Sequence, residues 1–188
     1  MQMSGEYRIP APREAVWDAL NDPDILKQCI PGCEDLVRNG ENGFDAKVVV
    51  KVGPVRAKFG GTVQLSDIDP PNGYTISGQG QGGAAGFAKG GATVKLAEDG
   101  EDTVLSYTVD ASVGGKLAQI GSRLIDATAK KMADDFFSRL AAIVGGPAAA
   151  EAPPPEAAAG EAIKLPAYLW VGGLVAIVII LLLVFANV

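Results

Sequence analysis

The fold of this protein is decided by the stretch GKLAQIGSRLIDATAKKMADDFFSRLAAIV, residues 115–144. Its apolar and small residues recur at steps of three and four, which is the period of an α-helix with one buried face. The pattern predicts one long helix over these residues. The predicted buried stripe consists of Leu117, Gly121, Leu124, Thr128, Met132, Phe136, Leu140 and Ile143.

The residues before this helix alternate with a period of two, which is typical of strands with one covered face. A strand is predicted over residues 2–9, two short helices between Pro12 and Cys29, and about six strands from residue 34 to 113. The turn sequences PPNG and EDGE separate some of these strands. This order predicts an α+β fold, in which an antiparallel sheet wraps around the long C-terminal helix. The predicted covered face consists of Phe44, Ala46, Val48, Val50, Val52, Val55, Ala57, Phe59, Gly61, Val63, Leu65, Tyr74, Ile76, Ala92, Val94, Leu96, Leu105, Tyr107, Val109, Ala111 and Val113.

A ligand pocket is expected between the sheet and the N-terminal half of the long helix, near residues 117–128. Small residues opposite a sheet leave room, whereas large ones fill it. Ala118, Gly121 and Ala127 are small, while Phe136 and Phe137 crowd the other half of the helix.

Composition divides the 188 residues into three parts. Residues 1–145 are predicted to form one ligand-binding domain, long enough to bury its own core. Residues 146–166 are rich in proline and alanine and predict a flexible, extended linker. Residues 167–188 carry no charge, and as a helix of about 33 Å they would cross a hydrocarbon core of about 30 Å. The tail is therefore predicted to be a single transmembrane anchor.

The expected location is the inner (plasma) membrane, with a single pass and the large domain in the cytoplasm. Tyr168 and Trp170 suit the headgroup level at the start of the span, and Lys164 lies just outside it. The first residues lack the charged and apolar regions of a signal peptide, so export of the domain is not expected.

Charge and residue types argue against several functions. The net charge is −6 without a basic arm, so nucleic acid is not an expected partner. The chain has no histidine, which removes the commonest general base and metal ligand. No nucleophile lies beside a base in the sequence, so we expect no catalytic residue and no metal site, and the chain is predicted not to be an enzyme. Cys29 and Cys33 are expected to be packed and reduced.

Two segments carry a family resemblance. Residues 11–23, APREAVWDALNDP, with residues 29–34, CIPGCE, look like the opening of the family of the G subunit of carbon monoxide dehydrogenase. Residues 114–125 and the later Phe136-Phe137 are similar to the final helix of that family. The family belongs to the START-like (SRPBCC), helix-grip superfamily, so the resemblance implies that fold with an apolar pocket. It also implies a partner, a molybdenum-containing carbon monoxide dehydrogenase or related hydroxylase, which members recruit to the membrane.

The leading hypothesis is a membrane-tethered accessory protein that binds an apolar ligand from the membrane. The expected ligand is a respiratory quinone, menaquinone or ubiquinone, held without a covalent bond, since the partner's electrons must reach the lipid phase. The open alternatives are a recruitment scaffold without ligand, a lipid carrier unrelated to carbon monoxide oxidation, and a cyclase. The predicted pocket residues are Val48, Val50, Phe59, Phe87, Tyr107, Leu117, Ile120, Gly121, Leu124, Ile125 and Thr128.

Two surface features have more than one interpretation. Lys47, Lys51, Arg56 and Lys58 lie opposite the apolar face of two neighbouring strands. They predict a surface for anionic headgroups or an acidic partner, or else a solvated sheet face. The glycine-rich residues 82–91 predict either a gate at the pocket mouth, with Phe87 near its tip, or a plain mobile hairpin.

Overall fold

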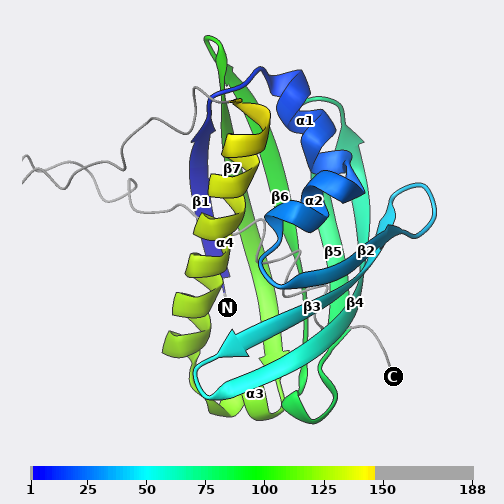
Figure 1. Ribbon diagram of the computed structural model, residues 1–188, viewed down its shortest axis with the longest axis vertical. Coiled ribbons are helices and arrows are strands. Elements are labelled where there is room, and N and C mark those ends of the chain that lie inside the picture. Colours follow the sequence, from blue (N-terminus) through cyan, green and yellow to red (C-terminus); the bar gives the residue numbers. More distant parts are fainter. Residues whose placement is uncertain (1, 147–188) are drawn as a thin grey trace, which may run out of the picture.

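Seven antiparallel strands form one sheet in the order β1–β7–β6–β5–β4–β3–β2 (Figure 1). The computed structural model describes residues 2–146. The elements are β1 (Gln2–Ile9), α1 (Arg13–Asn21), α2 (Pro23–Cys29), β2 (Cys33–Arg38), β3 (Gly43–Val52), β4 (Val55–Asp69), β5 (Gly73–Gln81), the 3₁₀ helix η1 (Gly83–Ala85), β6 (Phe87–Asp99), β7 (Asp102–Gly114), α3 (Lys116–Gln119) and α4 (Ser122–Val144).

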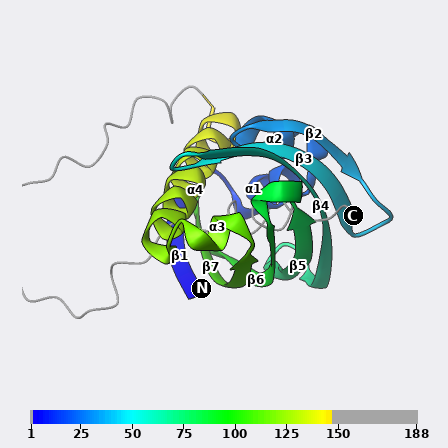
Figure 2. The ribbon, with the colours of Figure 1, turned by 90° about the horizontal axis from the view of Figure 1, so that it is seen from below.

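The sheet curves into an incomplete ring, and α4 lies at its open side, between β1 and β3 (Figure 2). Helices α1 and α2 cover the same inner face, and α2 contacts α4. The predicted α+β fold and element order are confirmed. The parity of the strands is also confirmed, because most residues predicted for the covered face are buried. Val55, Ala57, Leu65 and Val113 are partly buried and pack against the core.

The prediction of one helix over residues 115–144 is wrong. Gly121 adopts a φ of +98°, which a right-handed helix cannot contain, and so the chain forms the short helix α3 followed by α4. Within α4 the predicted stripe advances in steps of four residues, and each step moves about 40° around the helix, away from a single face. Leu124 and Ile143 of the predicted stripe are 48% and 41% exposed. The residues of α4 that are buried are Ile125, Ala129, Ala133, Phe136, Phe137 and Leu140.

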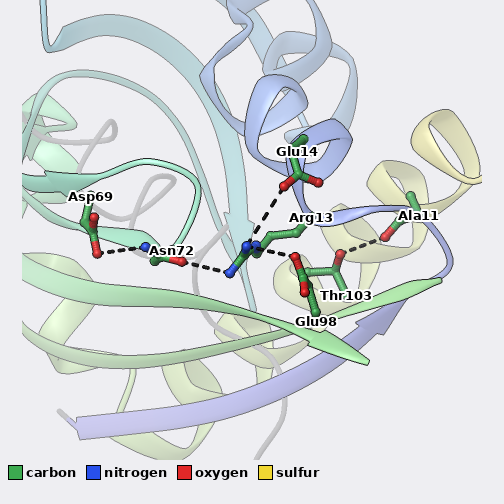
Figure 3. A network of polar contacts seen from close by, with 7 residues as sticks. All are labelled: Ala11, Arg13, Glu14, Asp69, Asn72, Glu98 and Thr103. Atoms are coloured by element: carbon green, nitrogen blue, oxygen red, sulfur yellow. Dashed lines mark hydrogen bonds and ion pairs between the residues drawn. The ribbon is translucent and has the colours of Figure 1, made fainter. Parts of the chain in front are cut away.

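Helix α1 is held to the turns at one end of the sheet by polar contacts (Figure 3). Arg13 pairs with Glu98 at 2.8 Å and donates a hydrogen bond to the side chain of Asn72 at 2.8 Å. The buried hydroxyl of Thr103 donates to the carbonyl of Ala11 at 2.7 Å. We call this the acidic end, because its turns and strand ends carry Asp67, Asp69, Glu98, Asp99, Glu101 and Asp102.

No helix within residues 2–146 is long and apolar enough to cross a membrane. The predicted span, residues 167–188, lies outside the described residues, as does the predicted linker beyond residue 146.

Candidate functional site

The inner face of the sheet is graded from glycine and alanine near one end to large side chains near the other. Gly61 lies opposite Gly80, Gly78 lies opposite Gly90, and Gly90 lies opposite Ala111. Directly opposed residues of antiparallel strands point to the same face. We call this area the glycine floor, which consists of Gly61, Gly78, Gly80, Ala88, Gly90 and Ala111.

Side-chain size increases along the strands from the glycine floor toward the acidic end. The next inner positions are Ile76, Ala92 and Val109, followed by Tyr74, Val94 and Tyr107, and then by Leu96 and Leu105.

Helix α4 repeats the gradient of the sheet. Its inward residues in the first half include Ala129 and Ala133, whereas Phe136 and Phe137 fill the second half. The small residues chosen from the sequence, Ala118, Gly121 and Ala127, are exposed instead. The small inward residues of the helix are therefore two other alanines, which follow the buried Ile125.

The far end of the glycine floor is covered by α3, η1 and the turn between β3 and β4, as the view from below shows (Figure 2). We call this the basic end, because the exposed side chains there include Lys51, Arg56, Lys89, Lys116 and Arg123. The ring of Phe59 lies directly against Gly82, where an added Cβ would come within 2.0 Å of it. Leu117 of α3 is buried, and Ile120 lies beside Gly53 of the β3–β4 turn. These contacts close the interior at this end.

A polar group of side chains lies within the apolar interior. Tyr7 of β1 donates a hydrogen bond to the carboxylate of Asp134 in α4 at 2.5 Å, and its ring stacks on Phe137. The ring of Tyr107 in β7 lies 6.5 Å from that of Tyr7. The hydroxyl of Tyr107 is buried and has no hydrogen-bond partner within residues 2–146.

Burial raises the pKa of both Tyr7 and Tyr107 far above the usual range of a phenol, and the Asp134 carboxylate raises both further. Both hydroxyls therefore stay protonated and act as hydrogen-bond donors. Sequence analysis missed Tyr7 and Asp134. The inward parity of Tyr7 in the first strand was an available signal, but the partner on α4 depends on the tertiary structure.

The structure brings part of the predicted pocket set together in the interior. Ile120 is half-buried beside the β3–β4 turn, and Phe87 is 47% exposed over Gly114. Gly121 and Leu124 are exposed, and the Thr128 hydroxyl donates to the Leu124 carbonyl at 2.9 Å. The buried members of the predicted pocket set are Val48, Val50, Phe59, Tyr107, Leu117 and Ile125. A role of the whole set in ligand binding remains a prediction.

Three of the predicted pocket residues meet in a groove on the outside of the domain. Val50 of β3 lines it with Leu124 and Thr128 of α4, and Lys131 and Asp135 lie along it as an ion pair at 2.9 Å. The groove has a volume of about 420 Å³ and is open to solvent. It is a second, more polar place where a ligand can contact these residues.

The four predicted surface cations lie on the outer face of β3 and β4, as their parity requires. Lys51 is directly opposite Arg56 beside the turn, while Lys47 and Lys58 lie farther along the strands. Lys58 forms an ion pair with Glu34 at 2.5 Å, which offsets one of the four charges. A role for this surface in membrane or partner binding remains a prediction.

The two thiols are free, with Cys29 buried and Cys33 partly buried. Burial raises the pKa of each to about 11, so both are protonated and poorly nucleophilic at neutral pH. Residues 2–146 contain no group of three or more Cys, Asp or Glu side chains placed to hold a metal ion.

Comparison with known proteins gives a family and a fold. The family model for the G subunit of carbon monoxide dehydrogenase (CoxG) matches residues 5–145. No curated protein matches the chain. A crystal structure of a conserved protein from Geobacillus kaustophilus is similar with 34% identity and a TM-score of 0.73, over 77% of this chain and 95% of that one. Because the matched region is nearly the whole of that protein, a domain of this extent can fold on its own.

Two more distant structures share the fold alone. A START superfamily protein from Mycobacterium smegmatis has 13% identity and a TM-score of 0.57, over 76% of this chain and 96% of its own. The Zhui aromatase/cyclase from a Streptomyces species has 14% identity and a TM-score of 0.59, over 77% of this chain and 93% of its own. These neighbours identify the described domain as START-like.

Proposed function

Because the chain belongs to the family of the G subunit of carbon monoxide dehydrogenase (CoxG), we propose that it is a membrane-tethered accessory protein of a molybdenum-containing carbon monoxide dehydrogenase or related hydroxylase. It binds an apolar ligand from the membrane, a menaquinone or ubiquinone, in the interior of its START-like domain. By doing so it links the soluble enzyme to the electron-transport chain of the inner membrane. Residues 167–188 hold it there, with the domain in the cytoplasm.

The observation that supports ligand binding is the combination of the glycine floor with the hydroxyl of Tyr107. Inner positions without side chains leave apolar backbone surface for a flat ring or a prenyl chain. A buried phenol without a partner is unfavourable by about 1–3 kcal/mol, and a ligand carbonyl would satisfy it. A quinone has both the apolar body and the carbonyl oxygens that this interior requires.

The chain contributes binding and orientation to the proposed reaction, and no catalytic step. Oxidation of carbon monoxide by water to carbon dioxide releases two electrons and two protons. One quinone takes up both and becomes a quinol, so the redox chemistry belongs to the partner and to the ligand. The protonated hydroxyl of Tyr107 would orient one quinone carbonyl.

A recruitment scaffold without ligand is the second candidate, and the exposed cations Lys47, Lys51 and Arg56 favour it. In that case, changing them to Glu abolishes capture of the dehydrogenase, while changes at Tyr107 have no effect. The carrier unrelated to carbon monoxide oxidation remains a third candidate. It differs from the main proposal in its apolar ligand and in having no role with the dehydrogenase.

Mass spectrometry of solvent extracts tests the proposal. Residues 1–146, purified from the native host without detergent, are expected to carry a quinone at close to one molecule per chain. A different lipid in that amount would favour the unrelated carrier. Folded protein without any apolar ligand would leave the scaffold as the better explanation.

The Tyr107→Phe variant tests how the ligand is held. Loss of one hydrogen bond is expected to weaken quinone affinity by about 2–10-fold, with little loss of stability, because no described group depends on this hydroxyl. Tyr74→Phe is the matched control, since the Tyr74 ring packs edge-on against Trp17 under α1. Equal affinity of both variants and the unchanged protein would contradict a role for Tyr107.

A further inference from the structure

Exposed cations gather at the basic end of the domain. Lys51 and Arg56 face one another beside the β3–β4 turn, Lys116 begins α3, and Arg123 lies in the first turn of α4. Lys89 follows in β6, two residues after Phe87. None of the five forms an ion pair with a residue between positions 2 and 146.

The acidic side chains on the same elements lie mostly farther along them, at Asp45, Asp67, Asp69, Glu98, Asp99, Asp134 and Asp135. Asp126 lies one turn into α4, and Asp110 of β7 accepts a hydrogen bond from Gln2. Most carboxylates are elsewhere, including the six of the acidic end, where Arg8 and Arg13 are the cations that pair with them. The domain is therefore an electric dipole along its long axis, although its net charge is negative.

Two large apolar side chains project among these cations. Phe87 and Leu124 are 47% and 48% exposed, and Leu124 and the half-buried Ile120 both lie beside Gly53 of the β3–β4 turn. Apolar side chains surrounded by Lys and Arg are typical of surfaces that lie in the headgroup layer of a bilayer. An acidic protein partner would also complement the charges and bury apolar side chains, and the test below separates it from a lipid surface.

We propose that the basic end docks on an anionic phospholipid surface, with Phe87 and Leu124 inserted among the headgroups. The purpose of this docking rests on the proposed function. The glycine floor adjoins the basic end, so a ligand would pass from the bilayer into the interior only when the contacts beneath α3 and η1 separate. The docking itself is independent of which ligand is carried.

The proposed orientation is compatible with the predicted tether. Helix α4 of 23 residues is about 35 Å long and ends at Val144, away from the basic end (Figure 1). Residues 146–166, if extended, would reach about 65 Å. The linker is thus long enough to return along the domain to the membrane.

Vesicle sedimentation tests the docking with residues 1–146 and without any quinone. We expect binding to vesicles of phosphatidylglycerol and phosphatidylcholine, weakening as salt is raised, and no binding to phosphatidylcholine alone. The Lys116→Glu/Arg123→Glu variant is expected to bind at least about 25-fold more weakly, since each cation near the surface contributes about fivefold. The Lys95→Glu/Arg139→Glu variant has the same net charge and should bind as the unchanged domain does.

A second variant separates insertion from simple attraction. Phe87→Ser/Leu124→Ser keeps every charge, and both side chains are half exposed, so circular dichroism should report an unchanged fold. It should lose most of the binding. Equal vesicle binding by the two charge variants, or no binding of the unchanged domain to anionic vesicles, would overturn the proposal. In that case, loss of dehydrogenase capture by the Lys116→Glu/Arg123→Glu variant alone would indicate an acidic protein partner. The extraction result is unaffected by either outcome, so the two proposals can fail separately.

Discussion

Gly82 carries a hydrogen where any other residue has a side chain, and the ring of Phe59 uses that space. Gly86 has a φ of +118°, and a Cβ added there would come within 2.1 Å of the carbonyl oxygen of Gly114. The glycine-rich stretch 82–91 is therefore a set of close backbone contacts that close one end of the interior. Whether it also opens as a gate remains a prediction.

The thiols of Cys29 and Cys33 predict a pH dependence of stability. Their pKa is about 11 in the folded chain, against an ordinary value of about 8.5 in the unfolded one. Between these values the unfolded chain has lost protons that the folded chain retains. The contribution is fully present below about pH 8.5, and the free energy of unfolding falls as the pH rises toward 11.

Urea unfolding at a series of pH values measures this effect. The Cys29→Ala/Cys33→Ala variant should show a shallower decline, because only its buried tyrosines still resist ionisation. Parallel pH curves for the variant and the unchanged domain would mean that the thiols ionise as freely in the folded state as in the unfolded one.

At the scale of elements, the strands followed from the sequence and the last helix did so only in part. Alternation placed Phe44, Val48 and Tyr107 on the covered face correctly, because a two-residue period leaves no choice of phase. The helical stripe failed at Leu124, since the four steps of four residues from Leu124 to Leu140 turn about 160° around a helix with 3.6 residues per turn. Gly121 looked like a small member of the stripe, whereas in the fold it ends α3 and precedes α4.

The Gly121→Ala variant distinguishes a broken helix from an unbroken one by the sign of the change in stability. In an unbroken helix this change would stabilise the domain by about 1 kcal/mol. At a φ of +98° an alanine is strained, and with no atom near the new Cβ the expected loss is about 1–2 kcal/mol from the backbone alone. Chemical denaturation measures the difference, and a gain in stability would contradict the break. Ala127→Gly, in an exposed position of α4, should lose about 1 kcal/mol in either case.

At the scale of the whole molecule, two gradients run along the same axis. The interior changes from the glycine floor to aromatic packing around Phe136, and the surface changes from the basic end to the acidic end. The end with the smallest inner residues is thus the end with the exposed cations. Neither gradient is visible along the sequence, because each is assembled from elements far apart in the chain, and β4, β6 and α4 contribute to both.

The tail prediction belongs to this scale. In native membranes, the full chain is expected to resist extraction by alkaline carbonate, because residues 167–188 would span the hydrocarbon core. A variant without these residues should be released by high salt, which screens the remaining attraction of the basic end. Fractionation with immunodetection measures both, and release of the full chain by carbonate would contradict the anchor.

The sequence by itself determined the class of fold, the order of elements and the covered face of each strand, since these depend on local periodicity and turn chemistry. Its opening and final-helix segments also identified the family that the comparison confirmed. Only the tertiary structure decided which residues meet. It placed Tyr7 and Asp134 beside Tyr107, turned Leu124 outward and gathered the cations at one end. The physical reason is that strand register and helix phase are set by long-range packing, which no local pattern records.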